Sequence, residues 1–317
     1  MSTEPIILFA GNPEKRAHYE PALTAAAQAE GLAPVIHMSP EGVDPATVDY
    51  MIFDGDGPIE DLAPFTGLKG VMNLWAGVEA ILRRDPPADL PIVRMVETGL
   101  TEGMRDYVVG HVMRHHIDVD TFINGPVIAE WEVTFPPLAR DRTVGILGLG
   151  VLGTDCGQHL ASHGFRVLGW SRSQKQIEGI TCLSGADGLD QIIRESEILV
   201  LLLPNTEQTR RILNADRLAK MPEGACIVNA GRGSLIEHDA LLAALDSGRI
   251  RHATMDVFDV EPLPADDPYW HHPRVTVTPH IASVTRPDTA SEAIMHQIAR
   301  AERGLGFENT VDRTLGY

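Results

Sequence analysis

The chain has 317 residues, of which 44% are hydrophobic, and it carries a formal net charge of −18. This length is ample for a sizeable core and favours two domains over one. The strongly acidic balance argues against nucleic acid and anionic membranes as partners, because both require basic patches on the protein.

In the first third of the chain, short apolar segments alternate with helical ones. The start, Met1–Pro5, lacks a basic region before an apolar run, so no signal peptide is predicted. A helix is expected at Glu14–Glu30. Strands are expected at Ile6–Phe9, Pro34–Met38, Tyr50–Phe53, Gly70–Leu74 and Ile92–Met95. Alternation at these spacings predicts a parallel sheet covered on both faces.

A long helix is predicted over Thr101–Ile123, and a second strand–helix series follows it. Its strands are expected at Thr143–Leu147, Arg166–Trp170, Ile198–Leu203, Cys226–Asn229, His252–Met255 and Thr276–Val277. A last helix, Asp288–Gly304, leaves a tail too short for another domain. We therefore expect an α/β fold with two Rossmann-like doubly wound parallel-sheet domains. A dinucleotide-binding domain of residues 102–284 would be inserted into a flavodoxin-like substrate domain of residues 1–101 and 285–317.

Three scattered cysteines, Cys156, Cys182 and Cys226, suit a reduced compartment without a disulfide framework. The longest apolar run, Ile198–Leu203, is too short to span a bilayer, so a cytoplasmic location is expected. His111 and His115 have the i, i+4 spacing of metal ligands, but nothing nearby completes a site, and no metal is expected.

The most informative segment is an apolar run that enters Gly-x-Gly-x-x-Gly, which then opens a predicted helix. Gly148 would permit the tight turn, Gly150 would let backbone approach a pyrophosphate, and Gly153 would let the helix pack closely on the strand. The amide groups at the helix start would hold the phosphate charge. The residues expected to bind the cofactor here are Gly148, Leu149, Gly150, Val151, Leu152 and Gly153.

The end of the next predicted strand indicates which dinucleotide binds. NAD-binding domains place a carboxylate there for the ribose 2′-OH, whereas Arg accommodates a 2′-phosphate. Here Ser171 takes the position of the acid, and Arg172 and Ser173 follow, with Lys175 close by. The alternative is a solvated loop of ordinary residues. The missing carboxylate favours NADP(H), with NAD(H) used at lower efficiency.

Three later motifs each place a polar side chain after a predicted strand, where ligands of open α/β sheets bind. The side chains are Arg232, Glu261 and His280. Reduction of a 2-oxo acid builds negative charge on the carbonyl oxygen, and His280 could supply the proton at neutral pH. Glu261 could orient the imidazole and favour its protonated form. The planar fork of Arg232 could bind the substrate carboxylate and polarise its carbonyl.

With these motifs, the chain resembles the D-isomer-specific 2-hydroxyacid dehydrogenase family over essentially its whole length. The matching segments are residues 148–153, 229–233, 256–264 and 278–283. The strand end at residues 170–173 and the segment 97–104 are similar to the glyoxylate/hydroxypyruvate reductase A branch.

The resemblance implies roles for further residues. Arg232 would bind substrate, His280 would be the acid/base group, and Glu261 would support it. Asp256 would bond the nicotinamide carboxamide, while Leu203, Pro204 and Ala230 would line the nicotinamide ribose. The amides of Ala76 and Gly77 would hold the substrate carboxylate. Trp75 stands where the family usually has a small residue, and it either narrows the pocket or packs outward.

The family is generally dimeric through its dinucleotide domains, so a homodimer is expected, with residues 125–140 as a suitable arm. The favoured function is NADPH-dependent reduction of small 2-oxo acids, with glyoxylate and hydroxypyruvate as candidates. Two alternatives stay open. One is another D-2-hydroxyacid dehydrogenase activity, of the D-lactate, phosphoglycerate or formate type. The other is a nucleotide-sensing, corepressor-like binding protein, although the intact set of Arg232, Glu261 and His280 argues against it.

Overall fold

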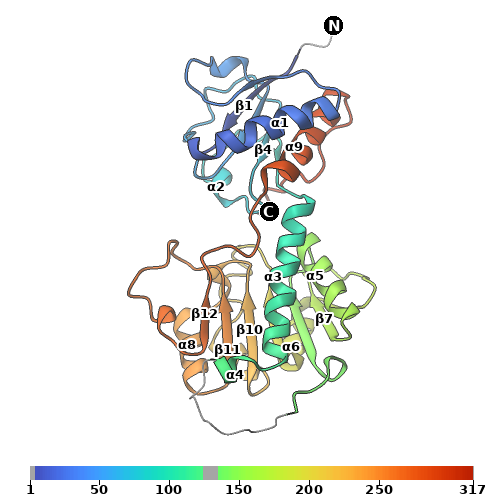
Figure 1. The fold of residues 1–317 in the computed structure, drawn as a ribbon, viewed down its shortest axis with the longest axis vertical. Coiled ribbons are helices and arrows are strands. Elements are labelled where there is room, and N and C mark those ends of the chain that lie inside the picture. The colour runs from blue at the N-terminus through green and yellow to red at the C-terminus, as the bar shows by residue number, and fades with distance from the viewer. Residues whose placement is uncertain (1–3, 124–134, 317) are drawn as a thin grey trace. The chain divides into compact units, whose positions relative to one another are not determined.

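The computed structural model describes residues 4–123 and 135–316. The chain divides into two compact units (Figure 1). Unit 1 comprises the chain up to Leu100 and from Thr285 onward, and unit 2 comprises Thr101–Val284. The predicted fold class, two parallel-sheet α/β domains, is confirmed.

Unit 1 contains a five-stranded parallel sheet in the part of the chain that the structure describes. Its strand order, β2-β1-β3-β4-β5, is the flavodoxin-like doubly wound order. The strands are β1 (Ile6–Ala10), β2 (Val35–His37), β3 (Tyr50–Phe53), β4 (Gly70–Asn73) and β5 (Ile92–Val93). β1, β3 and β4 are almost entirely buried, because helices and loops cover both faces of the sheet.

Helices from both chain ends cover one face of the unit 1 sheet. α1 (Arg16–Ala29) and α9 (Pro287–Glu302) share a buried cluster with β1, β3 and β4 (Figure 1). The short α2 (Glu79–Leu82) packs on the other face. The C-terminal tail pairs with β5, where Val311 N–H donates to the Ile92 carbonyl at 2.8 Å. Unit 1 is therefore built from both ends of the chain.

Unit 2 contains, among its described residues, a seven-stranded parallel sheet in the order β12-β11-β10-β9-β6-β7-β8. This is the Rossmann order with one added strand at the β12 edge. The strands are β6 (Thr143–Leu147), β7 (Arg166–Trp170), β8 (Ile180–Leu183), β9 (Ile198–Leu201), β10 (Ala225–Asn229), β11 (Ile250–Met255) and β12 (Val275–Val277).

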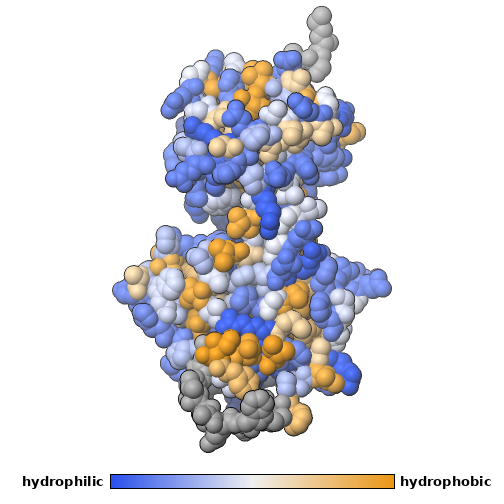
Figure 2. Space-filling model, in the orientation of Figure 1, coloured by the Kyte–Doolittle hydropathy of each residue, from blue (hydrophilic) through white to orange (hydrophobic). Residues whose placement is uncertain are grey.

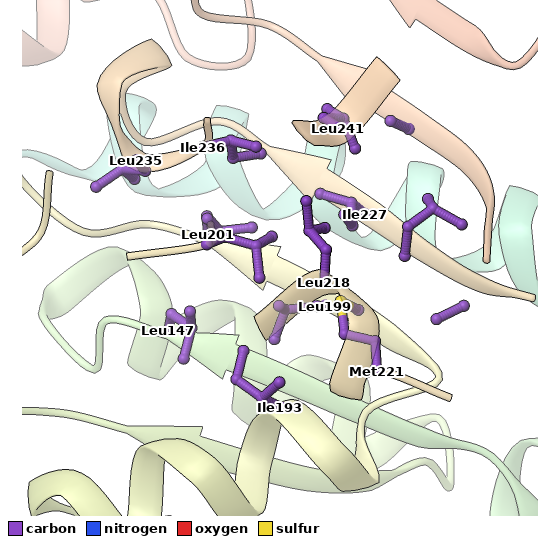
Figure 3. Close-up of a cluster of buried hydrophobic side chains, with 14 of the residues drawn as sticks. Leu147, Ile193, Leu199, Leu201, Leu218, Met221, Ile227, Leu235, Ile236 and Leu241 are labelled. Carbon is purple, nitrogen blue, oxygen red and sulfur yellow. The ribbon is translucent and has the colours of Figure 1, made fainter. Parts of the chain in front are cut away.

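Helices cover both faces of this sheet. α3 (Thr98–His116), which begins in unit 1, and α5 (Val151–Ser162) pack on one face. α6 (Gly185–Glu195), α7 (Ala215–Lys220) and α8 (His238–Asp246) pack on the other. Figure 3 shows the second core, in which Leu199, Leu201 and Ile227 from the strands meet Ile193, Leu218 and Leu241 from these helices. Short 3-10 turns lie at Pro13–Lys15, Pro45–Thr47, Ala139–Asp141, Gly233–Leu235 and Pro268–Trp270.

The local structure differs from the prediction in two places, one wrong helix and one strand that was not predicted. The expected single helix over residues 101–123 is two helices, α3 and α4 (Asp120–Ile123). The chain breaks between them because Asp118 adopts a left-handed conformation with φ of 58° and forms an ion pair with Arg251. The strand β8 was not predicted, because its Thr and Cys interrupt the apolar pattern and only Ile180 is buried.

No helix within residues 4–123 and 135–316 is long and apolar enough to cross a membrane. No group of three or more His, Cys, Asp or Glu side chains in that part of the chain is arranged to hold a metal ion. Ile117, Phe122 and Ile123 are exposed around α4, where Figure 2 shows a hydrophobic area on unit 2.

Candidate active site

The predicted cofactor loop lies between β6 and α5. Gly148 has a φ of 109°, and a Cβ there would lie 2.7 Å from the Leu202 carbonyl oxygen. A Cβ at Gly153 would lie 1.8 Å from the Gly148 carbonyl oxygen. Glycine is therefore required at both positions by the protein's own backbone.

Gly150 differs, because a Cβ there would have no protein atom within 4 Å among the described residues. Space is thus open at the start of α5, where helix amides and the helix dipole favour a phosphate group. The arrangement fits a dinucleotide pyrophosphate. Leu149 is buried under the loop, and Val151 and Leu152 begin the helix with Val151 largely exposed.

The loop after β7 holds the residues expected at the 2′-phosphate. Ser171 is buried, and its hydroxyl donates to the Ser173 carbonyl at 2.8 Å, so it shapes the loop. Arg172 and Ser173 are exposed. The Lys175 ammonium donates to the Leu149 carbonyl of the glycine loop at 2.5 Å. This last contact links the two predicted phosphate sites directly.

The predicted nicotinamide residues lie at the carboxyl ends of β9, β10 and β11. Leu203 and Ala230 are mostly buried, and the Pro204 carbonyl accepts the Thr209 hydroxyl at 2.6 Å. Asp256 is fully buried, with its carboxylate bonded to Thr278, Ile281 and Ala282. The hydrogen bonds of the carboxylate are thus all to the loop that carries His280.

The three candidate catalytic side chains are in unit 2, on loops after β10, β11 and β12. His280 Nδ1 lies 2.7 Å from Glu261 Oε2, and the Phe258 amide donates to Glu261 Oε1 at 2.8 Å. This leaves Nε2 as the imidazole nitrogen directed away from the carboxylate. His280 has a φ of 54°, a conformation that non-glycine residues adopt rarely.

The contact shifts the pKa of both partners. The hydrogen bond with Glu261 raises the pKa of His280, against the opposing effects of burial and of the Arg232 charge. Burial acts to raise the pKa of Glu261, but hydrogen bonds from His280 and the Phe258 amide outweigh it and lower that pKa. The pair therefore favours a charged imidazolium beside a carboxylate.

Arg232 is placed by its own loop. The Asn229 side chain donates to the Arg232 carbonyl at 2.9 Å and accepts the Gly231 amide at 3.2 Å. A Cβ at Gly233 would lie 2.0 Å from the Phe258 carbonyl carbon. Glycine at this position lets the loop with Arg232 pass directly beside the loop with Glu261.

The predicted substrate loop follows β4 in unit 1. Asn73, which no sequence motif marks, is buried and donates to the Trp75 and Gly77 carbonyls at 2.6 and 2.8 Å. In the described part of the chain, the amides of Ala76 and Gly77 have no acceptor. A buried Asn at a strand end, just before the loop, was the available sequence signal for this anchor.

The Trp75 indole packs against its own unit. A Cβ at Gly55 would lie 2.7 Å from the ring, and Lys15 Nζ is 5.9 Å from the ring centroid. Lys15 in turn pairs with the buried Asp54 at 2.7 Å. The ring therefore lies over the loop after β3.

These features define a two-unit α/β protein whose second unit is a Rossmann-type dinucleotide-binding domain carrying an Arg, Glu and His set. A family model described as the D-isomer specific 2-hydroxyacid dehydrogenase NAD binding domain matches residues 110–282. The chain belongs to the D-isomer specific 2-hydroxyacid dehydrogenase family.

Relatives of known name support this membership. The chain is 41% identical over 266 residues to a glyoxylate/hydroxypyruvate reductase A from Serratia proteamaculans, covering 82% of this chain and 85% of the relative. It is 43% identical over 267 residues, with the same coverage, to the protein of that name from Yersinia enterocolitica.

Solved structures agree. A D-isomer specific 2-hydroxyacid dehydrogenase from Xanthobacter autotrophicus Py2, in complex with NADPH and MES, is 39% identical with a TM-score of 0.91, covering 99% of this chain and 100% of that one. The NADPH-dependent glyoxylate/hydroxypyruvate reductase from Sinorhizobium meliloti, in complex with NADP and sulfate, is 35% identical with a TM-score of 0.88 and the same coverage.

Proposed function

We propose that this protein is an NADPH-dependent reductase that converts small 2-oxo acids, such as glyoxylate and hydroxypyruvate, into 2-hydroxy acids. The observation that carries the proposal is the 2.7 Å contact between His280 and Glu261, beside a loop that presents Arg232. The names of the relatives from Serratia, Yersinia and Sinorhizobium support the same chemistry.

The cofactor would lie along the carboxyl ends of the unit 2 strands. The glycine loop at residues 148–153 would hold the pyrophosphate. Arg172 and Ser173 would hold the 2′-phosphate on the loop that Ser171 shapes, with NADH used less efficiently. Leu203, Pro204, Ala230 and Asp256 would surround the nicotinamide end. When bound, NADPH supplies the hydride for reduction.

The chain's own residues would bind and orient the 2-oxo acid. The Arg232 guanidinium would bind the carboxylate and polarise the adjacent carbonyl. In unit 1, the amides of Ala76 and Gly77 would donate to a substrate carboxylate, and the exposed part of Trp75 would border the substrate.

His280 would hold the proton that the reduced carbonyl oxygen receives, through Nε2, since Nδ1 bonds to Glu261. The raised pKa of His280 keeps that proton available at neutral pH. Glu261 would keep the ring in one orientation and stabilise its charge.

The decisive experiment is a panel of 2-oxo acids offered with NADPH and with NADH, followed by loss of cofactor absorbance. We expect turnover of glyoxylate and hydroxypyruvate with preference for NADPH. His280→Ala should abolish most turnover while the protein still binds NADPH. Tight NADPH binding without turnover of any acid would contradict the proposal and favour a nucleotide-sensing role. Preference for D-lactate or phosphoglycerate oxidation would place the protein elsewhere in the family.

We also propose a homodimer in the cytoplasm. At least half of the surface of the apolar residues Ile117, Phe122, Ile123 and Leu138 in unit 2 is exposed, as expected for interface residues seen in a single chain. Residues 125–134 of the expected dimer arm, with Trp131, lie outside the described residues. Sedimentation equilibrium of the wild type and of Phe122→Glu tests the assembly, since the variant should be monomeric.

A further inference from the structure

Helix α3 packs directly on the loop that carries His280. A Cβ at Gly103 of α3 would lie 3.3 Å from the Ser283 hydroxyl. The next residue, Met104, shares a buried cluster with Ala282. One turn further along, the Tyr107 hydroxyl lies 2.7 Å from the Thr278 hydroxyl. One face of α3 thus contacts both ends of the loop.

A chain of hydrogen bonds leads from Tyr107 into the centre of this loop. The Thr278 hydroxyl bonds to Asp256 Oδ1 at 2.6 Å. An ionised carboxylate only accepts, so Thr278 donates its single hydrogen to Asp256. Tyr107 must therefore donate to Thr278, and the direction of the chain is set.

Asp256 in turn accepts hydrogen bonds from the backbone amides of His280 and of the two residues that follow it. The Ile281 amide donates to Oδ1 and the Ala282 amide donates to Oδ2, each at 2.9 Å, while the His280 amide donates to the Asp256 carbonyl at 2.9 Å. His280 itself has the strained φ of 54°. Such a conformation persists only where surrounding contacts hold it.

We infer that Tyr107 is a positioning residue for catalysis, acting through Thr278 and Asp256 to hold the loop in which His280 faces Glu261. Its hydroxyl touches neither the imidazole nor the carboxylate of Glu261. It completes the hydrogen bonding of the Thr278 hydroxyl. In this way it helps to fix the orientation of the fully buried Asp256 carboxylate. The inference rests on the proposed role of His280.

A structural role alone would have a different outcome, so the test needs a matched control. Tyr107→Phe keeps the ring, which packs on His111 with centroids 4.4 Å apart, and removes only the hydroxyl. Tyr50→Phe is the control, because the Tyr50 hydroxyl also makes a partly buried hydrogen bond, at 2.6 Å to Glu302, but in unit 1. Both variants lose one phenol hydrogen bond.

The first readout is amide hydrogen exchange of peptides covering residues 278–284, measured without substrate. We expect faster exchange in Tyr107→Phe and in Thr278→Val, and wild-type exchange in Tyr50→Phe and Thr278→Ser. This measurement does not require that the protein be a reductase, so it stands even if the proposed function fails.

The second readout is kcat for reduction of glyoxylate. Tyr107→Phe should lower kcat about tenfold, because small displacements of a catalytic group are costly. Thr278→Val should lower it at least as much, the double variant should add little, and Thr278→Ser should restore it. The inference is overturned if exchange of the loop is unchanged in Tyr107→Phe, or if exchange rises while kcat stays at the level of Tyr50→Phe.

Discussion

The Nδ1 atom of His280 lies 2.7 Å from Oε2 of Glu261, and this contact joins the loop after β12 to the loop after β11. The two residues are 19 positions apart in the chain. Their pairing fixes which imidazole nitrogen faces the carboxylate and which is left for a substrate, and the first prediction follows from it.

Replacing Glu261 by Gln should move the pH dependence of reduction. The hydrogen bond to Glu261 raises the pKa of His280, so a neutral amide lowers it again. Reduction needs protonated His280. As pH rises, activity should therefore begin to fall at a lower pH in the variant than in the wild type. The measurement is kcat/KM for glyoxylate across neutral pH. Glu195→Gln, on a surface ion pair with Arg166, is the control and should keep the wild-type profile. An unshifted pH profile in Glu261→Gln would rule out His280 as the titrating acid.

Alanine at Gly150 should weaken cofactor binding, whereas alanine at Gly153 should lower stability. Gly150 has open space and an ordinary φ of −75°, so Gly150→Ala should keep the melting temperature but weaken NADPH binding about tenfold or more. Gly153→Ala places a Cβ 1.8 Å from a carbonyl oxygen and should lower the melting temperature of the cofactor-free protein by several degrees. Calorimetry and NADPH titration separate the two. Equal NADPH affinity in Gly150→Ala and wild type would show that the pyrophosphate lies elsewhere.

Removing the Arg172 side chain should affect NADPH alone. A hydrogen bond to a charged group contributes about 1.5–3 kcal/mol, so Arg172→Ala should raise the KM for NADPH by about 10- to 100-fold. The efficiency with NADH should not change, because NADH has no 2′-phosphate. Arg166→Ala, at the other end of β7, is the matched control. A parallel loss with both cofactors would mean that Arg172 supports the loop and does not read the phosphate.

Acid should destabilise unit 2 through its buried histidines. Burial lowers the pKa of His252 to about 4 and also lowers that of His115. Unfolded histidine titrates near 6.5, so between about pH 6.5 and about 4 only the unfolded chain binds these protons. Stability is therefore present above this window and is lost as pH falls through it.

The test is the midpoint of urea unfolding at several pH values. His252 bonds to the Thr276 hydroxyl at 2.8 Å, a contact that Gln can replace. His252→Gln should show a shallower loss of stability on acidification than wild type. The exposed His18, replaced by Gln, should leave the slope unchanged. Identical slopes in all three proteins would contradict the assignment of the acid sensitivity to His252.

Regular apolar patterns allowed most of the fold to be predicted. Strands such as Tyr50–Phe53 and Ile198–Leu201 are buried on both faces, and such strands consist almost wholly of apolar residues. The edge strand β8 has no such pattern and was missed. The end of α3 was misplaced because Arg251, which pairs with Asp118 there, is distant in sequence.

Some residues of the candidate site could likewise be predicted from local sequence patterns, and others could not. Gly148, Arg232, Glu261 and His280 were predicted as site residues from motifs, because their chemistry and their position after a strand are visible locally. Tyr107 has no local signal, since its partner Thr278 lies 171 residues away. The orientation of Trp75 was also open until its packing on Gly55 was known.

The sequence by itself determined the class of fold, the glycine loop and the candidate catalytic side chains, because these depend on residue type and spacing along one strand or turn. Only the tertiary structure decided the His280–Glu261 distance, the hydrogen bonds of Asp256 and the contact of α3 with the loop that carries His280. These depend on how separate strands align in a sheet and on which helix packs over them, and each is a relation between residues that the chain keeps far apart.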